Sequence, residues 1–414
     1  MRKIKESGVA WIGSIPSNWT LYKMKHIGRY INGYAFKPED WSATGLPIIR
    51  IQDLTGSNDN PNFYNGQLPE KYHIYNGDIL VSWAATLSAF VWDKGEGWLN
   101  QHIFKAIPDE KIMDCNYYFW LLKTAMAYMN DDNKHGIMMQ HVTLPVFNNF
   151  IVPIPPKAQQ RTVAVVLDKK IRQIDALIAN VQTQIEKLQA YKQSLITEVV
   201  TRGLDPSVPM KDSSVEWIGK IPTTWTTIRV KQLLSERKER SVDGSEEPLS
   251  MSQKFGLVPT KDLNIIPNMA SSFVGAKLAY VNDLVFNKLK AHLGVFSVSR
   301  YNGLVSPDYA VYRSTGKINL KYLEYLFKTP QCISEFRKRS TGIAAGLTRL
   351  YTDGLFAIEC PFPPAKDQEN IVEYLNAKCA QIDRLSALKQ AKIDKLNEYK
   401  KSLIYEYVTG KKEA

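Results

Sequence analysis

The sequence has few cysteines and no long apolar run. Its four cysteines, Cys115, Cys332, Cys360 and Cys379, form no Cys-x-x-Cys pair. We therefore expect buried, reduced thiols in a cytoplasmic protein rather than disulfides or a zinc site. No stretch of about 18 apolar residues occurs, so no membrane span is expected. The basic N-terminus is not followed by the apolar segment that a signal peptide needs.

Motifs for catalysis are also missing. The chain has no GxxxxGK[ST] phosphate loop, no glycine-rich nucleotide loop and no Asn-Pro-Pro-aromatic motif. The Glu-Arg-Lys triplet at 236–238 lacks the upstream aspartate that a nuclease metal site would need. Of six scattered histidines, only His135 and His141 approach the spacing of metal ligands. We therefore expect a non-catalytic protein with no metal or cofactor of its own.

Acidic residues are the minority, and the basic excess is uneven. The chain has 53 Lys and Arg against 41 Asp and Glu, a formal net charge of +12. Residues 21–150 contain 11 basic and 13 acidic residues, whereas residues 228–350 contain 19 and 10. A basic region of this size is typical of a domain that binds a polyanion, usually nucleic acid, although a solvated surface would also account for it.

One phrase occurs twice in the chain. VAWIGSIPSNWT begins at Val9, and VEWIGKIPTTWT begins 206 residues later at Val215. Further on, eight of the eleven positions in Tyr191–Thr201 are identical in Tyr399–Thr409. Each copy therefore has a short signature, a variable body, a Pro-Pro boundary and a terminal segment. We predict bodies at 1–152 and 206–360, terminal segments at 153–205 and 361–414, and an internal pseudo-twofold repeat.

Each terminal segment has the period of a long helix. Apolar residues recur in alternating steps of three and four, a heptad pattern that needs a partner helix along its whole length. Gly203 and Gly410 mark the expected helix ends. We predict that the two helices pair with each other as a coiled coil, although each could instead pack on its own body. The predicted seam residues are Leu167, Ile171, Ile174, Ile178, Ile185, Leu188, Leu375, Ile382, Ile393 and Leu396.

Polar residues interrupt this seam. Lys192 breaks the apolar row of the first helix, and Ser386, Lys389 and Lys400 break that of the second. The two bodies are rich in aromatic and β-branched residues, with turn signals at short intervals and a helical stretch late in each. The sequence thus predicts an α+β fold class, with two α/β domains separated by two long helices.

The remaining candidates for chemistry are side chains suited to DNA recognition. Amide, Arg and Lys groups on loops can read base edges in the major groove, and cations can neutralise phosphates. Any one of them could instead be a solvated surface residue. The Arg-Lys-Arg run at 337–339 is the strongest phosphate candidate, because three adjacent cations before a turn rarely serve packing. The candidates are Arg50, Gln52, Trp83, Thr86, Asn100, Gln101, His102, Lys134, His135, Gln253, Lys254, Asn287, Lys288, Lys290, His292, Arg337, Lys338, Arg339 and Arg349.

The repeated motifs resemble those of a known family. VTRGLDPSVPMKDSSVEWIGKIPTTW, from Val200 to Trp225, is similar to the central conserved region of type I restriction–modification specificity subunits, and ESGVAWIGSIPSNW resembles the same element. PPKAQQ and PPAKDQ resemble the family's helix starts, in which Gln160 and Gln368 hold the matching glutamine.

The resemblance implies a concrete function. Each body would be a target recognition domain that reads half of a split double-stranded DNA sequence. The two helices would form an antiparallel coiled coil that fixes the gap between the halves. The helices, with Gln160 and Gln368, would dock two methyltransferase subunits that carry S-adenosylmethionine. A separate restriction and motor subunit would use ATP. The alternative is a two-headed coiled-coil adaptor whose bodies bind proteins, which the basic second body disfavours.

Overall fold

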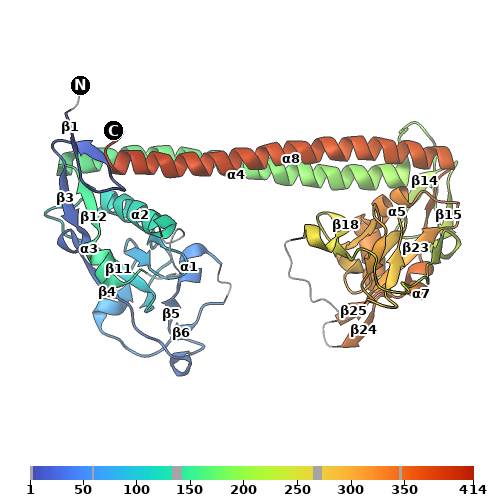
Figure 1. Ribbon diagram of the computed structural model, residues 1–414, viewed down its shortest axis with the longest axis horizontal. Coiled ribbons are helices and arrows are strands. Elements are labelled where there is room, and N and C mark those ends of the chain that lie inside the picture. The colour runs from blue at the N-terminus through green and yellow to red at the C-terminus, as the bar shows by residue number, and fades with distance from the viewer. Residues whose placement is uncertain (1–2, 58–59, 133–141, 264–272, 345–346) are drawn as a thin grey trace. The chain divides into compact units, whose positions relative to one another are not determined.

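The computed structural model describes residues 3–57, 60–132, 142–263, 273–344 and 347–414 (Figure 1). The chain forms two compact units. Unit 1 contains Met1–Val181 and Ala391–Ala414, and unit 2 contains Gln182–Gln390. The two longest helices, α4 (Lys157–Arg202) and α8 (Ala365–Val408), therefore contribute one part to each unit. Within the described part of the chain, no helix is long and apolar enough to cross a bilayer.

Unit 1 is built from short strands and few helices. Its other helices are α1 (Ile51–Thr55), α2 (Cys115–Asp132) and α3 (Leu144–Asn149). Its strands are β1 (Ile4–Glu6), β2 (Ser14–Pro16), β3 (Thr20–Lys23), β4 (Gly28–Asn32), β5 (Leu46–Ile49), β6 (Phe63–Tyr64), β7 (His73–Ile74), β8 (Ile79–Ser82), β9 (Ser88–Val91), β10 (Gly97–Leu99), β11 (Ile103–Pro108) and β12 (Ile151–Ile154).

The centre of unit 1 is an antiparallel sheet in the order β4-β11-β8-β9. A second sheet has the order β6-β5-β10-β7, in which β10 and β5 are parallel. The main core joins Val81 of the sheet, Leu121 of α2, Leu167 of α4 and Leu403 of α8, all fully or almost fully buried. The fold of unit 1 is therefore completed by the last helical turns of the chain, more than 200 residues away from its other elements.

Unit 2 repeats this plan with different local elements. Its other helices are α5 (Leu320–Phe327), α6 (Pro330–Arg339) and α7 (Thr352–Phe356). Its strands are β13 (Met210–Asp212), β14 (Lys220–Pro222), β15 (Thr226–Arg229), β16 (Leu234–Glu236), β17 (Leu249–Ser252), β18 (Gly256–Pro259), β19 (Lys277–Ala279), β20 (Leu284–Asn287), β21 (Phe296–Val298), β22 (Gly303–Val305), β23 (Tyr309–Ser314), β24 (Thr341–Ala344), β25 (Leu347–Arg349) and β26 (Glu359–Phe362).

The central sheet of unit 2 has the order β16-β23-β20-β21, the same antiparallel pattern as in unit 1. In place of the single helix α2, unit 2 has two helices, α5 and α6. Pro330 causes the break, because a proline disfavours helical geometry in the residue before it. Thr329 then starts α6 by accepting a hydrogen bond from the backbone N–H of Cys332.

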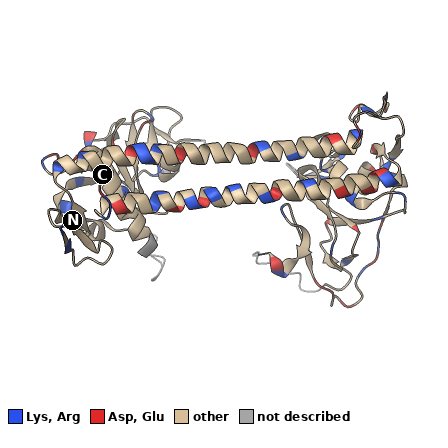
Figure 2. Cartoon of the chain, turned by 90° about the horizontal axis from the view of Figure 1, so that it is seen from above, with Lys and Arg blue, Asp and Glu red and all other residues tan. Residues whose placement is uncertain are grey.

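The two long helices pair with each other antiparallel in both units, which confirms the predicted coiled coil. In unit 1, Asp175 of α4 contacts Lys400 of α8. In unit 2, Gln184 contacts Lys389 and, further along α4, Lys192 contacts Asp383. Each step forward along α4 thus matches a step backward along α8. Figure 2 shows basic and acidic residues interspersed along both helices.

The predicted seam residues lie on the inner faces of these helices. Ile178, Ile185, Leu188 and Leu396 are half-buried. The others are buried: Leu167, Ile171, Ile174, Leu375, Ile382 and Ile393. The polar interruptions have partners on the opposite helix, because Lys192 pairs with Asp383 and Ser386 accepts a hydrogen bond from Gln189. The seam therefore combines apolar packing with a few polar contacts.

Candidate nucleic-acid interface and helix joints

In unit 1, several of the candidate DNA-binding residues meet at one end of the central sheet. The loop after β8 and the loop before β11 lie side by side, because the N–H of Trp83 donates to the carbonyl oxygen of His102 at 3.3 Å. The two rings are 5.5 Å apart. Val142 joins the same place by donating its N–H to the Trp83 carbonyl. Thr86 and His102 are exposed there, Gln101 is half-buried and Asn100 is buried.

Unit 2 has the same junction with different side chains. The N–H of Lys288 donates to the carbonyl oxygen of Asp308 at 3.3 Å, and Leu350 donates to the Lys288 carbonyl at 3.0 Å. These bonds match those of unit 1, so Trp83 corresponds to Lys288 and His102 to Asp308. We call residues 83–87 with 100–102, and residues 287–294 with 306–308, the sheet-end loops of units 1 and 2.

Other candidates of unit 2 gather around its sheet-end loops. Lys290 is exposed, and Asn287 and His292 are half-buried. Gln253 reaches the same loops by donating its side-chain amide to the carbonyl of Leu293 at 3.3 Å, and Lys254 is its neighbour in sequence. The structure therefore brings together amide and cationic groups that are more than 30 residues apart in the sequence.

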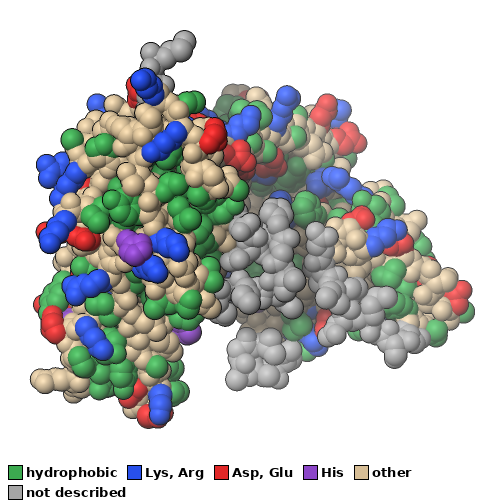
Figure 3. Space-filling model, turned by 60° about the vertical axis from the view of Figure 1, so that its left-hand side comes forward, with side chains coloured by type: hydrophobic (Ala, Val, Ile, Leu, Met, Phe, Trp, Pro, Cys, Tyr) green, Lys and Arg blue, Asp and Glu red, His purple; other side chains and the backbone are tan. Residues whose placement is uncertain are grey.

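The electrostatics of the two sheet ends differ. In unit 2, Lys277 of β19 donates to the carbonyl of Tyr309, and its pKa is lowered by burial and then by repulsion from Lys288. Lys277 and Lys288 thus lie close enough to repel each other at the sheet end of unit 2, within the basic region of residues 228–350. On the face shown in Figure 3, basic and acidic side chains are interspersed.

Some candidates lie in other surroundings. Arg50 and Gln52 are on or beside α1, where the Arg50 guanidinium lies 4.7 Å from the ring centre of Trp41. Lys134 and His135 fall outside the described residues.

The cationic run at 337–339 is the end of helix α6 rather than a loop. Lys338 and Arg339 both form ion pairs with the buried carboxylate of Glu335 on the same helix. Two of the three cations therefore have a structural partner, which removes the reason for expecting a phosphate contact from them. Arg337 is exposed, so the phosphate-contact prediction depends on it alone.

Gln160 and Gln368 lie inside the fold, not on an exposed interface as we expected. The side chain of Gln160 accepts the N–H of Asp114 at 2.7 Å and donates to the carbonyls of Ile112 and Pro155. It is 1% exposed. Its amide thus ties the first turn of α4 to the segment that precedes α2, so no face of it is left for a partner protein.

Gln368 repeats this arrangement in unit 2. It accepts the N–H of Asn319 at 2.7 Å and donates to the carbonyls of Lys317 and Pro363. The start of α8 is thereby tied to the start of α5. Each unit thus holds the first turn of its own long helix through one buried glutamine, a helix joint that the sequence motif alone did not reveal.

Each unit also holds the end of the other long helix. In unit 1 the hydroxyl of Tyr117 donates to the carbonyl of Val408 at 3.2 Å, and in unit 2 the hydroxyl of Tyr322 donates to that of Val200 at 2.9 Å. Gly203 ends α4 with a φ of 80°, and Gly410 follows α8 with a φ of 72°. A β-carbon on Gly410 would lie 2.6 Å from Pro16, so only glycine fits there.

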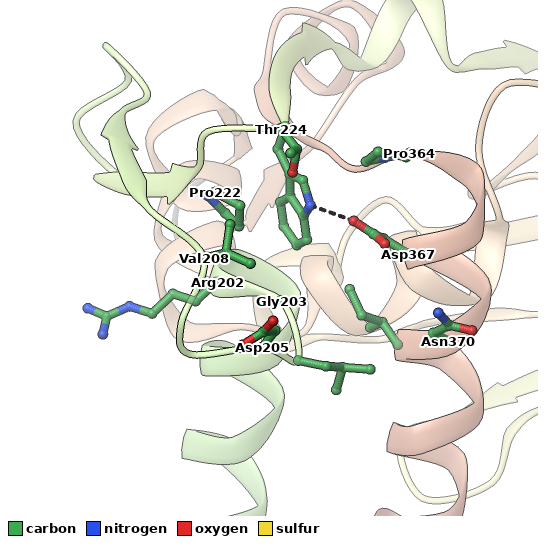
Figure 4. Close-up of a pocket in the computed structure, with 12 residues that line it drawn as sticks. Arg202, Gly203, Asp205, Val208, Pro222, Thr224, Pro364, Asp367 and Asn370 are labelled. Carbon is green, nitrogen blue, oxygen red and sulfur yellow. Dashed lines mark hydrogen bonds between the residues drawn. The ribbon is translucent and has the colours of Figure 1, made fainter.

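Beyond Gly203, the chain of unit 2 borders a cavity of about 460 Å³ (Figure 4). The indole N–H of Trp225 donates to the Asp367 carboxylate at 3.0 Å on its wall, while Arg202 points away from this contact. Trp19 makes the matching bond to Gln159 in unit 1. The cavity lies between the end of α4, the first turns of α8 and the last part of the repeated signature, at Pro222 to Trp225.

Among the described residues, no group of three or more His, Cys, Asp or Glu could hold a metal ion. Cys332 and Cys360, which both lie among the described residues, are buried. Burial raises the pKa of both thiols, that of Cys360 to about 12. These thiols are packing groups rather than nucleophiles.

The chain is similar in sequence and in fold to known proteins. Residues 16–187 match the family model of the type I restriction modification DNA specificity domain. A specificity subunit of the MjaVIII type I restriction enzyme of Methanocaldococcus jannaschii is 24% identical over 96% of this chain and 93% of its own length. The chain is similar to type I restriction–modification specificity subunits over nearly its whole length.

Two further matches differ in how much they cover. The specificity subunit of the EcoBI type I restriction enzyme of Escherichia coli is 26% identical over 48% of this chain and 42% of its own length, so that match spans less than half of the Escherichia coli protein. A solved chain, described under complex assembly and conformational transition of the type I R-M system, has a TM-score of 0.69 at 15% identity. It covers 95% of this chain and 98% of that one, which shows a shared fold.

Proposed function

We propose that this specificity subunit selects the DNA target of a type I restriction–modification complex. Unit 1 and unit 2 each read one half of a bipartite double-stranded sequence, and the α4–α8 coiled coil sets the spacing between the halves. The chain also docks two methyltransferase subunits, and a restriction and motor subunit joins the complex. We further propose that it works in the cytoplasm.

One observation carries the recognition part of this proposal. The same backbone junction occurs at one sheet end of both units, yet its side chains differ, with Trp83 and His102 in unit 1 and Lys288 and Asp308 in unit 2. A fixed frame with exchanged side chains is what two readers of different base sequences need, because base identity is read by side-chain groups and not by the fold.

A second observation supports two equivalent docking sites for the methyltransferase subunits. In unit 1, Leu177 and Tyr399 are each 51% exposed. Both are close in sequence to the residues of the Asp175–Lys400 contact. Unit 2 exposes the repeat-related Leu385 and Tyr191 at 42% and 57%. Exposed leucine and tyrosine on a helix pair are typical anchors for another protein. Two matched pairs fit two copies of one partner.

The chemistry then lies on the partners. We propose that this chain catalyses nothing itself. S-adenosylmethionine would bind the methyltransferase subunits and ATP the motor subunit. Specificity and catalysis would thereby sit on separate chains.

An exchange of recognition bodies tests the proposal. Residues 21–150 are replaced by the equivalent body of another specificity subunit, and the complex with its methyltransferase partner is used to map methylated adenines on genomic DNA. We expect one half of the methylated sequence to change, while the other half and the spacing stay the same. The matched control replaces residues 228–350, which should change only the opposite half.

Two results would count against the proposal. If neither exchange altered the methylated sequence, the bodies would not be the readers. If the unaltered complex bound random duplex and cognate duplex equally at physiological salt, the chain would act as a two-headed adaptor for proteins.

A further inference from the structure

The sheet-end loops of unit 2 hold an arginine in place with an aspartate. The guanidinium Nη2 of Arg349, at the end of β25, donates to Oδ1 of Asp308 at 2.6 Å. The carbonyl of Asp308 in turn accepts the N–H of Lys288, and the residue after Arg349 donates its N–H to the Lys288 carbonyl. Three chain segments are thereby fixed around one guanidinium.

Arg349 is not fully satisfied by the protein. Its Nε is buried and has no hydrogen-bond partner, and among the described residues of unit 2 it is the one buried side-chain nitrogen or oxygen in this state. A buried donor left unpaired costs folding free energy. Local conflicts of this kind in native proteins cluster where function requires them. The side chain remains 24% exposed, so part of the guanidinium faces solvent.

We propose that Arg349 is a specificity-determining residue of unit 2 that reads a guanine, and that Asp308 is its positioning residue. This inference rests on the proposed function. Arginine presents two parallel N–H donors that match the O6 and N7 acceptors of guanine in the major groove. A carboxylate that accepts from one Nη fixes the plane of the guanidinium while leaving other donors for the base.

At the junction of unit 1, a histidine stands where unit 2 has this carboxylate. The residue that corresponds to Asp308 is His102, whose ring lies 5.5 Å from that of Trp83. The arginine–aspartate pair is therefore a feature of the second sheet end. It follows that the guanine it reads belongs to the half-site of unit 2, and that changes at Arg349 leave the half-site of unit 1 unaffected.

The test uses the full chain in its complex with the methyltransferase partner. Arg349→Gln, Arg349→Lys and Asp308→Asn are compared with the unaltered chain by mapping methylated adenines and by measuring binding to duplexes with each base substituted. Arg349→Gln and Arg349→Lys are each expected to reduce discrimination at one G·C pair by roughly tenfold to a hundredfold. The first half-site should stay fully specified.

The conservative variants separate a reading role from a structural one. Arg349→Lys keeps the charge and loses the planar fork, so a lysine variant that still discriminates the G·C pair overturns the proposal. Asp308→Asn keeps the size of the side chain and weakens the ion pair, and it should give a smaller loss at the same base pair. Arg313→Gln is the matched control, because Arg313 is an exposed arginine near the far end of β23.

The outcomes also separate this inference from the proposed function. Sequence-specific methylation by the unaltered complex together with an unchanged pattern for Arg349→Gln overturns the inference alone. Loss of both half-sites together with a lower melting temperature in both Arg349 variants assigns a merely structural role to the pair. A complex of the unaltered chain that shows no sequence preference overturns the proposed function itself.

Discussion

The ammonium group of Lys192 lies 2.7 Å from both carboxylate oxygens of Asp383, across the helix pair of unit 2. The repeat places Lys400 and Asp175 in the same relationship in unit 1, with the helices exchanged. A lysine that interrupts an apolar seam is therefore matched twice by an aspartate of the partner helix. Such pairs favour one register of an antiparallel helix pair over its neighbours.

Neutralising Lys192 should have a small effect on stability. Its side chain is 24% exposed and that of Asp383 is 55% exposed, so solvent screens the pair. We expect Lys192→Met to lower the unfolding free energy by less than about 1 kcal/mol, measured by urea denaturation at low and high salt. The double variant Lys192→Asp with Asp383→Lys exchanges the two charges and should recover most of the lost unfolding free energy. A loss of several kcal/mol would mean that the pair is more than a register contact.

Two adjacent residues of α4 should differ in how much a change to aspartate lowers the unfolding free energy. Ile178 packs against the main core of unit 1, whereas Leu177 is 51% exposed. Ile178→Asp is expected to lower the unfolding free energy by about 1–3 kcal/mol, because a carboxylate replaces an apolar contact. Leu177→Asp should leave stability within about 0.5 kcal/mol of the unaltered chain.

Leu177→Asp also tests the proposed docking of the methyltransferase subunits. Leu177→Asp should reduce the number of methyltransferase subunits bound from two to one, measured by native mass spectrometry, and Leu385→Asp should do the same at the other site. A complex that retains two subunits with both leucines replaced would place the docking sites elsewhere.

The helix joints should be the most sensitive polar positions in the chain. Gln160→Ala would leave the N–H of Asp114 and the carbonyls of Ile112 and Pro155 without their partner. We expect a loss of about 2–4 kcal/mol, since each buried unpaired group costs about 1–3 kcal/mol. Gln173→Ala, on the exposed side of the same helix, is the control and should change stability little. Similar losses of unfolding free energy from Gln160→Ala and Gln173→Ala would contradict the structural role of Gln160 in the helix joint.

Stability should depend on pH through Glu324. Burial alone would raise the pKa of this carboxylate, but Lys328 at 2.6 Å and Lys321 at 2.9 Å lower it below 4.5. A depressed pKa in the folded state contributes stability above the unfolded pKa, and this contribution is lost as the pH falls through the folded value. Glu324→Gln should therefore cost about 1.5–3 kcal/mol at pH 7.

The pH profile provides the check on that prediction. The difference in unfolding free energy between Glu324→Gln and the unaltered chain should shrink as the pH falls below about 4. Thermal unfolding in a series of buffers measures this difference. Glu369→Gln, an exposed carboxylate on α8, should show almost no difference at any pH. A constant difference across the series would assign the effect to packing rather than charge.

Much of the candidate site could not be predicted from sequence. Trp83, Asn100 and Lys288 were found by residue type, but nothing in the sequence indicated that the loop after β8 meets the loop before β11, because strand pairing is non-local. Asp308 was not a candidate, since an acidic residue repels phosphate, and only its contact with Arg349 gives it a role. The lone glutamines of the helix starts could not be distinguished from surface residues until their burial was known.

The sequence by itself determined the duplicated plan, the two long helices and the apolar seam along each, because heptad period, Pro-Pro boundaries and terminal glycines are local signals that survive in both copies. The tertiary structure decided which distant segments complete each unit. Val408 completes unit 1, which is otherwise built from residues up to Val181, and in unit 2 the carbonyl of Val200 is held by Tyr322, 122 residues further along the chain. It also decided which polar side chains are structural, since burial and hydrogen-bond partners depend on contacts that no local pattern encodes.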